Sequence, residues 1–149
     1  MTLTEKIDSQ IKEAMKSKDS IKLESLRAIK SSIILFNTKK GNSREISEND
    51  ELQILTKLVK QRKESAEIFT SQNRIELAKI EIDQAEIIKG FLPEQLSESE
   101  IEKRIITIIK EINASGMKDM GKVMGQASKE LSGKADGKTI SIIVRKNLS

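Results

Sequence analysis

The chain has 149 residues, of which 34% are charged and 2% aromatic, and it contains no cysteine, histidine, tryptophan or tyrosine. The missing cysteine excludes disulfides and thiolate nucleophiles, and the missing histidine excludes a Ser-His-Asp triad and imidazole ligands for zinc. This length allows one compact domain or two small ones. The sequence shows neither a long apolar run for a membrane span nor the apolar core of a signal peptide, so we expect a cytoplasmic protein without a membrane partner.

Apolar residues recur at steps of three and four along nearly the whole chain, and the alternation typical of strands is missing, so we predict an all-α fold. Thr2 with Glu5 forms a capping box that begins the first helix, and Asp19 or Ser20 begins the second. The residues expected to face inward are Leu3, Ile7, Ile11, Ala14 and Met15 in the first helix, and Leu23, Leu26, Ile29, Ile33 and Phe36 in the second.

Residues 37–43 have the composition of a loop, and Ser47 with Asp50 then begins a long third helix. Its apolar residues follow a nearly heptad spacing, so it should pack along a neighbour at a shallow angle. Asn73 with Glu76 predicts the start of a fourth helix. The residues expected to face inward are Leu52, Leu55, Val59, Ala66 and Phe69 in the third helix, and Leu77, Ile80, Ile87 and Ile88 in the fourth.

Gly90 and the only proline, Pro93, interrupt the helical pattern, so we predict a boundary there between a four-helix bundle (1–93) and a small three-helix domain (94–149). Ser97 with Glu100 begins the fifth helix. Five of the seven glycines lie between 116 and 137 and divide the remainder into helices at about 119–131 and 136–148. The residues expected to face inward are Ile101, Ile105, Ile108, Ile109, Ile112, Met120, Val123, Met124, Ala127, Leu131, Ile140, Ile143, Val144 and Leu148.

The glycines of this last segment have predicted roles of their own. Gly133 should end a helix in the left-handed conformation, and Asp136 should cap the next one. Gly121 and Gly125 lie four residues apart on one helix face, so we expect a neighbouring helix or the linker to approach closely there.

The net charge of +4 is concentrated at one end of the chain. Residues 113–149 carry 7 basic and 3 acidic side chains, whereas residues 1–112 carry 20 of each. The helix starts near Asp119 and Asp136 should present free N–H groups, which together with nearby lysines suit phosphate. An ordinary solvated surface is the alternative. The candidate nucleic-acid-binding residues are Lys118, Lys122, Lys129, Lys134, Lys138, Arg145 and Lys146.

Two other site patterns are rejected, and we expect no cofactor and no metal. The segment 133–139 ends in Gly-Lys-Thr, but three residues separate its glycines where a P-loop has four, and no strand precedes it. Glu81 and Glu86 in the fourth helix are expected to form structural ion pairs rather than a metal site.

Three C-terminal motifs, Phe91-Leu-Pro-Glu-Gln-Leu96, Asp119-Met-Gly-Lys-Val-Met-Gly125 and Gly133-Lys-Ala-Asp-Gly-Lys138, resemble the GatB/YqeY family. Upstream, Arg27, Lys60-Gln-Arg62, Ser65 and Phe69 resemble the N-terminal half of YqeY-type proteins. The resemblance implies two all-helical domains. The second is similar to the tail of the GatB subunit of the glutamine-dependent tRNA amidotransferase, which is associated with holding tRNA. Phe91 departs from the tyrosine usual in the family, which removes a hydroxyl and keeps the packing.

The resemblance implies work on tRNA, and the residues do not supply catalysis, because no activated nucleophile for releasing ammonia from glutamine is visible. We therefore expect a non-catalytic accessory protein that binds tRNA or another structured RNA by contacting the backbone of the RNA. One alternative is a component of a carbon–nitrogen ligase with glutamine as amido-N-donor. Another is an adaptor that binds a protein partner through the N-terminal helices.

Overall fold

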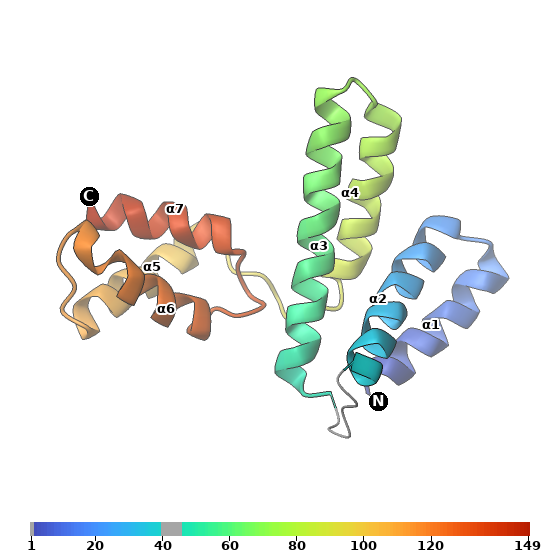
Figure 1. Ribbon diagram of the computed structural model, residues 1–149, viewed down its shortest axis with the longest axis horizontal. Helices are drawn as coiled ribbons and strands as arrows, with labels where there is room; N and C mark the ends of the chain where they lie inside the picture. Colours follow the sequence, from blue (N-terminus) through green and yellow to red (C-terminus); the bar gives the residue numbers. More distant parts are fainter. Residues whose placement is uncertain (1, 40–45) are drawn as a thin grey trace. The chain divides into compact units, whose positions relative to one another are not determined.

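The computed structural model describes residues 2–39 and 46–149 (Figure 1). Every regular element within these residues is a helix, which confirms the all-α prediction. The chain divides into two compact units, Met1–Leu92 and Pro93–Ser149. The helices are α1 (Leu3–Ser17), α2 (Ser20–Thr38), α3 (Glu48–Ser71), α4 (Ile75–Lys89), α5 (Glu98–Glu111), the short 3₁₀ helix η2 (Met117–Asp119), α6 (Met120–Glu130) and α7 (Gly137–Leu148).

Most of the predicted helix starts are confirmed. Capping boxes begin α1 at Thr2, α3 at Ser47 and α5 at Ser97, and in each the residue three positions on bonds back to the cap. The Asp19 carboxylate accepts a 3.1 Å hydrogen bond from the Lys22 N–H at the start of α2. These side chains satisfy N–H groups that have no partner inside their own helix. None of the described helices has the length and apolar character needed to cross a membrane.

The predicted cap of α4 is wrong. Arg74, not Asn73, precedes the helix, and it makes no side-chain capping bond. Asn73 instead adopts a left-handed conformation with φ of 60°, and the Arg74 N–H donates to the Phe69 carbonyl oxygen at 2.8 Å. Asparagine tolerates this conformation better than most residues, so it closes the turn after α3.

The loop predicted at 37–43 begins later than expected, because α2 continues through Thr38. Residues 40–43 of that prediction lie outside the described residues.

The first unit has a core formed by residues of α1, α2, α3 and α4. The inward prediction fails for Met15, Leu77 and Ile80, which are 56%, 40% and 39% exposed. α3 and α4 pack along one another (Figure 1), and Ala78 and Ala85 of α4 are buried. The buried apolar residues of this core are Ile7, Ala14, Leu26, Ile29, Ile33, Leu55, Leu58, Val59, Ala85 and Ile88.

A buried polar link joins three helices of the first unit. Gln84 in α4 donates from Nε2 to Glu24 Oε2 in α2 at 3.1 Å. Its Oε1 accepts from Arg62 Nε in α3 at 3.3 Å, and Arg62 Nη1 also donates to the Leu58 carbonyl oxygen at 3.2 Å. Gln84 is 7% exposed, so these bonds replace the water it loses on folding.

The second unit has its own core. The inward predictions for α6 and α7 are confirmed, with Met120 and Met124 partly buried. In α5 the prediction fails only for Ile112, which follows the last helical residue and is 38% exposed. The buried residues are Ile101, Ile105, Ile108, Val123, Ala127, Leu131, Ile140, Ile143, Val144 and Leu148.

The segment that precedes α5 is tied to the loop between α6 and α7. The Leu96 N–H donates to the Lys134 carbonyl oxygen at 2.9 Å, and Gln95 Nε2 donates to the Gly133 carbonyl oxygen at 2.7 Å. Gly133 has φ of 76°, which confirms its left-handed conformation. These bonds fix the backbone of the loop that carries Lys134.

Candidate nucleic-acid interface

All seven candidate basic residues are exposed and lie on four segments of the second unit. They are Lys118 in η2, Lys122 and Lys129 in α6, Lys134 in the loop, and Lys138, Arg145 and Lys146 in α7.

On α6, two of these lysines share one outward face. Val123 and Ala127 are fully buried and fix which side of α6 meets the core. Lys122 and Lys129 are seven residues apart, close to two full turns, so their side chains leave the same side of the helix. Lys122 is 79% exposed.

On α7, Lys138 and Arg145 are likewise seven residues apart and lie opposite the buried Ile140 and Val144. Lys146 is turned toward α5, where its Nζ lies 3.6 Å from Glu102 Oε1. α7 packs against α6 and runs in the opposite direction (Figure 1). The structure therefore puts Lys138 and Arg145 on the outer face of α7 and separates Lys146 from them.

The three acidic residues of this segment are each engaged by other groups of the protein. Asp119 Oδ2 accepts from the Ser115 N–H at 2.8 Å, and its Oδ1 lies 4.0 Å from Lys122 Nζ. Asp136 Oδ1 accepts from the Thr139 N–H at 2.7 Å, which confirms the predicted cap of α7.

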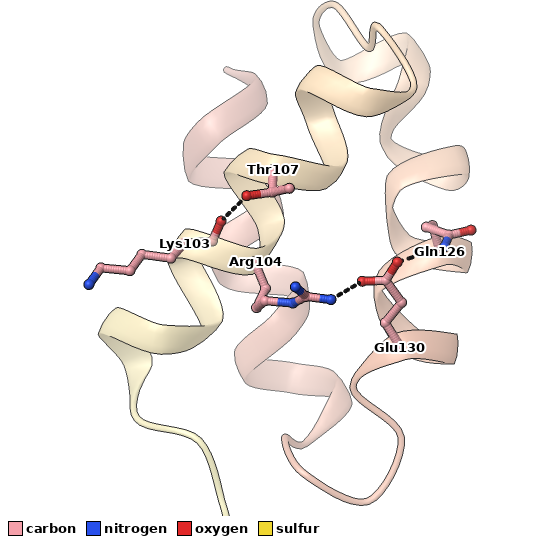
Figure 2. A network of polar contacts seen from close by, with 5 residues as sticks. All are labelled: Lys103, Arg104, Thr107, Gln126 and Glu130. Atoms are coloured by element: carbon pink, nitrogen blue, oxygen red, sulfur yellow. Dashed lines mark hydrogen bonds and ion pairs between the residues drawn. The ribbon is translucent and has the colours of Figure 1, made fainter.

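Glu130, the third acidic residue, belongs to a network between α5 and α6 (Figure 2). Its Oε2 lies 2.9 Å from Arg104 Nη2, and its Oε1 accepts from Gln126 Nε2 at 2.9 Å. Figure 2 shows Arg104 reaching across from α5 toward α6, while Lys103 points away. The negative charge of Glu130 is therefore compensated by a cation of the neighbouring helix.

The starts of α6 and α7 have fewer free backbone N–H groups for a phosphate than the sequence predicts. The Thr139 N–H in the first turn of α7 is already bonded to Asp136. η2 leads directly into α6, and the Met120 N–H donates to the Met117 carbonyl oxygen. The N–H groups of Thr139 and Met120 are thus used inside the protein and are not free to bind an anion.

The close approach predicted at Gly121 and Gly125 is wrong. A Cβ added to either glycine would have no heavy atom within 4 Å beyond its own helix backbone and adjoining residues. Both glycines are exposed, and Gly125 lies three residues after Lys122 and four before Lys129. This part of the α6 surface is therefore open and has lysines beside it.

The candidates drawn from the sequence do not include Arg104, which lies on α5 before the basic segment begins. Its side chain is 55% exposed and stands at the α5–α6 seam through its bond to Glu130. The buried Ile101, Ile105 and Ile108 define the inward face of α5 and indicate that Arg104 lies beside that face. The partner of Arg104 on α6 follows only from the tertiary structure.

Two groups of relatives share sequence with this chain. One subunit of the glutamyl-tRNA(Gln) amidotransferase of Thermococcus sibiricus is 46% identical over 57 residues, which cover 36% of this chain and 9% of that protein. Its counterpart in Methanocaldococcus jannaschii is 44% identical over 71 residues, or 45% of this chain and 11% of that protein. The chain thus spans about a tenth of these amidotransferase proteins.

The mitochondrial protein of Clavispora lusitaniae named altered inheritance of mitochondria protein 41 is 34% identical over 108 residues, covering 70% of this chain and 61% of that protein. The family described as Yqey-like protein matches residues 4–148. That match takes in nearly all of both helical units, and the chain belongs to the YqeY-like family.

Proposed function

We propose that this chain is a non-catalytic accessory protein that binds tRNA or another structured RNA through the exposed basic residues of η2, α6, α7 and the loop between α6 and α7. One observation carries the proposal. The acidic residues after position 113 are engaged by other protein groups, whereas in the part of the chain that the structure describes only Lys122 and Lys146 of the seven basic residues are in ion pairs. The other five cations are available for phosphates, and so is Lys122, because its ion pair to Asp119 is 4.0 Å long and its side chain is 79% exposed.

Such a surface would recognise the RNA backbone rather than the bases. The second unit contains no aromatic residue, so it has no aromatic side chain on which a base could stack. Lysines dominate the set, and a lysine ammonium contacts phosphate as a point charge without reading base edges. We therefore expect salt-sensitive binding with weak sequence dependence.

The names of the relatives support the proposal. The amidotransferase relatives are named for a reaction on glutamyl-tRNA, which is consistent with a shared segment that contacts tRNA. The proposed function requires a compartment that contains tRNA, and we propose that the protein acts in the cytoplasm. The Clavispora lusitaniae relative is named as a mitochondrial protein.

A filter-binding titration with total tRNA at several salt concentrations tests the proposal. With about four to six phosphate contacts, log K should fall against log salt with a slope of roughly −3 to −5. Replacing Lys118, Lys122, Lys134 and Lys138 by alanine should weaken binding and make this slope shallower by about 3, at 0.7 to 0.9 per contact.

The matched control replaces four exposed lysines of the first unit by alanine, namely Lys6, Lys12, Lys16 and Lys57. Both variants lose the same total charge, so a difference between them reports position and not net charge. Equal binding of the two variants, or unchanged binding of the first at low salt, contradicts the proposal.

A second candidate function is that of a protein adaptor, favoured by apolar side chains exposed on α3 and α4. Ile68, Ile75 and Ile82 are 56%, 56% and 49% exposed, and Ile75 and Ile82 leave the same side of α4 because they are seven residues apart. Copurification of a partner that survives nuclease and is lost in Ile75→Lys/Ile82→Lys would favour this function. Retention of that partner by the double variant would contradict it.

A third candidate is a component of a carbon–nitrogen ligase that uses glutamine, as the names of the amidotransferase relatives suggest. Within the described residues no group of three or more carboxylates is placed to hold a metal ion. Release of ammonia from glutamine by the pure protein would support the ligase function and overturn the non-catalytic proposal.

A further inference from the structure

Glu130 differs from the other two acidic residues near the candidate interface. Asp119 and Asp136 accept hydrogen bonds from backbone N–H groups and so help to shape the turn that precedes α6 and the start of α7. Glu130 instead bonds to the side chains of Arg104 and Gln126 (Figure 2). Its carboxylate can therefore change partner without a change in the backbone.

An incoming anion can replace the Glu130 carboxylate as the partner of Arg104. Its contact to Glu130 uses Nη2, and the side chain remains 55% exposed while that of Glu130 is 26% exposed. A guanidinium carries five N–H donors in a planar fork that fits a phosphate as well as a carboxylate. Exposed ion pairs contribute little to stability, so exchanging one for an ion pair with phosphate costs little.

The pair is also dispensable for holding α5 against α6. The two helices share a continuous apolar core through Ile105, Ile108, Val123 and Ala127, each at most 1% exposed. Burial of these side chains supplies far more stabilisation than one exposed pair. The position of α5 therefore does not depend on Glu130.

We propose that Arg104 is a further phosphate contact of the RNA-binding surface, held by Glu130 in the free protein and passed to an RNA phosphate on binding. The inference rests on the proposed function. It assigns the α5–α6 seam to the interface and makes Glu130 the residue that limits its affinity for RNA.

The test is a double-mutant cycle on the full chain, with total tRNA as the probe. Glu130→Gln keeps the shape of the side chain and removes its charge, so the ion pair that holds Arg104 is lost. At salt of about 0.1 M we expect binding to tighten roughly threefold to tenfold, and the salt slope to steepen by about 0.7 to 0.9 for one added contact. In the Arg104→Gln background the same substitution should change binding less than about twofold.

Glu111→Gln is the matched control, because it removes an exposed carboxylate from the same unit at the end of α5. An equal gain from Glu111→Gln, or an equal gain from Glu130→Gln with and without Arg104, would mean that charge alone acts and would overturn the inference. So would a lowered melting temperature of Glu130→Gln with unchanged tRNA affinity, because the pair would then be structural only. Failure of the unsubstituted chain to bind tRNA at low salt would overturn the proposed function together with the inference. The outcomes above, in which the unsubstituted chain binds tRNA, would overturn the inference alone.

Discussion

The Asp119 carboxylate accepts a 2.8 Å hydrogen bond from the backbone N–H of Ser115, four residues earlier in the chain. The Asp119 side chain is 17% exposed. The bond spans the turn between α5 and α6, in which Asn113 and Gly116 both have positive φ. Asp119 therefore has a structural role in the turn that presents Lys118, in addition to its charge.

Replacing Asp119 by alanine should lower the free energy of unfolding by about 1–2 kcal/mol, because the Ser115 N–H loses its acceptor. Asp119→Asn keeps an acceptor oxygen and should lose less. Urea unfolding followed by far-UV circular dichroism measures both. Equal losses for the two variants would show that the carboxylate charge, and not its hydrogen bond, stabilises the turn.

The two exposed glycines of α6 should be replaceable with a gain in stability. Alanine at Gly121 and Gly125 would meet no neighbouring atom and would reduce the entropy of the unfolded chain, so each substitution should add up to about 1 kcal/mol. Thermal unfolding measures the gain. Gly116→Ala is the control and should destabilise, because its φ of 74° strains any residue with a Cβ.

Gln84 should be costly to remove although it is neutral. It bonds to Glu24 on α2 and accepts from Arg62 on α3. Gln84→Ala leaves both charged groups without this partner and should cost about 1–3 kcal/mol of unfolding free energy. Gln84→Glu keeps an acceptor for Arg62 but replaces the amide that donates to Glu24 with a second carboxylate, so it should also destabilise at neutral pH. Protonation should relieve the repulsion between the two carboxylates, so the Glu variant should recover stability at low pH while the Ala variant should not.

Glu51 near the start of α3 should make stability depend on pH. Burial, and after it the charge of Glu48, raise the pKa of the Glu51 carboxyl above its ordinary value. The native state therefore holds this proton more tightly than the unfolded chain does. The resulting stabilisation is present below the ordinary pKa and is lost as pH rises through the raised value. Glu51→Gln should raise the urea midpoint at about pH 7 and leave it unchanged at about pH 3, whereas the opposite pattern would contradict the sign of the shift.

How well the sequence predicts the buried face of a helix depends on whether the apolar residues of that helix are confined to one face. In α6 and α7 most apolar residues lie on one face, and all the predicted inward residues are buried or partly buried there, while Ile142 of α7 is 60% exposed. α4 carries isoleucine or leucine on several faces, so the pattern does not say which face is covered. The tertiary structure decides, because α4 packs against α2 and α3 with Ala78 and Ala85 buried and Ile75 and Ile80 exposed.

In the candidate interface, too, some features are predictable from the sequence and others depend on the tertiary structure. Helical periodicity accounts for the exposure of Lys122 and Lys129, because Val123 and Ala127 must face the core. The pairing of Lys146 with Glu102 joins residues 44 positions apart, and that of Arg104 with Glu130 joins residues 26 apart. Such pairings depend on how three helices pack, and a single sequence carries no direct signal for them.

The second unit should fold on its own as the fragment 93–149. Its core is drawn entirely from α5, α6, α7 and Leu131, which directly follows α6, and the bonds of Gln95 and Leu96 to the α6–α7 loop lie within the same unit. Domains of about 60 residues hide only about 60% of their unfolded surface, so the fragment should be marginally stable but should melt cooperatively by circular dichroism. Ile105 is fully buried, and Ile105→Ala should cost about 2–5 kcal/mol, enough to unfold the fragment. If the unsubstituted fragment lacks helical signal, the unit depends on residues 1–92 for its fold, and the surfaces of α6 and α7 must then be studied only in the full chain.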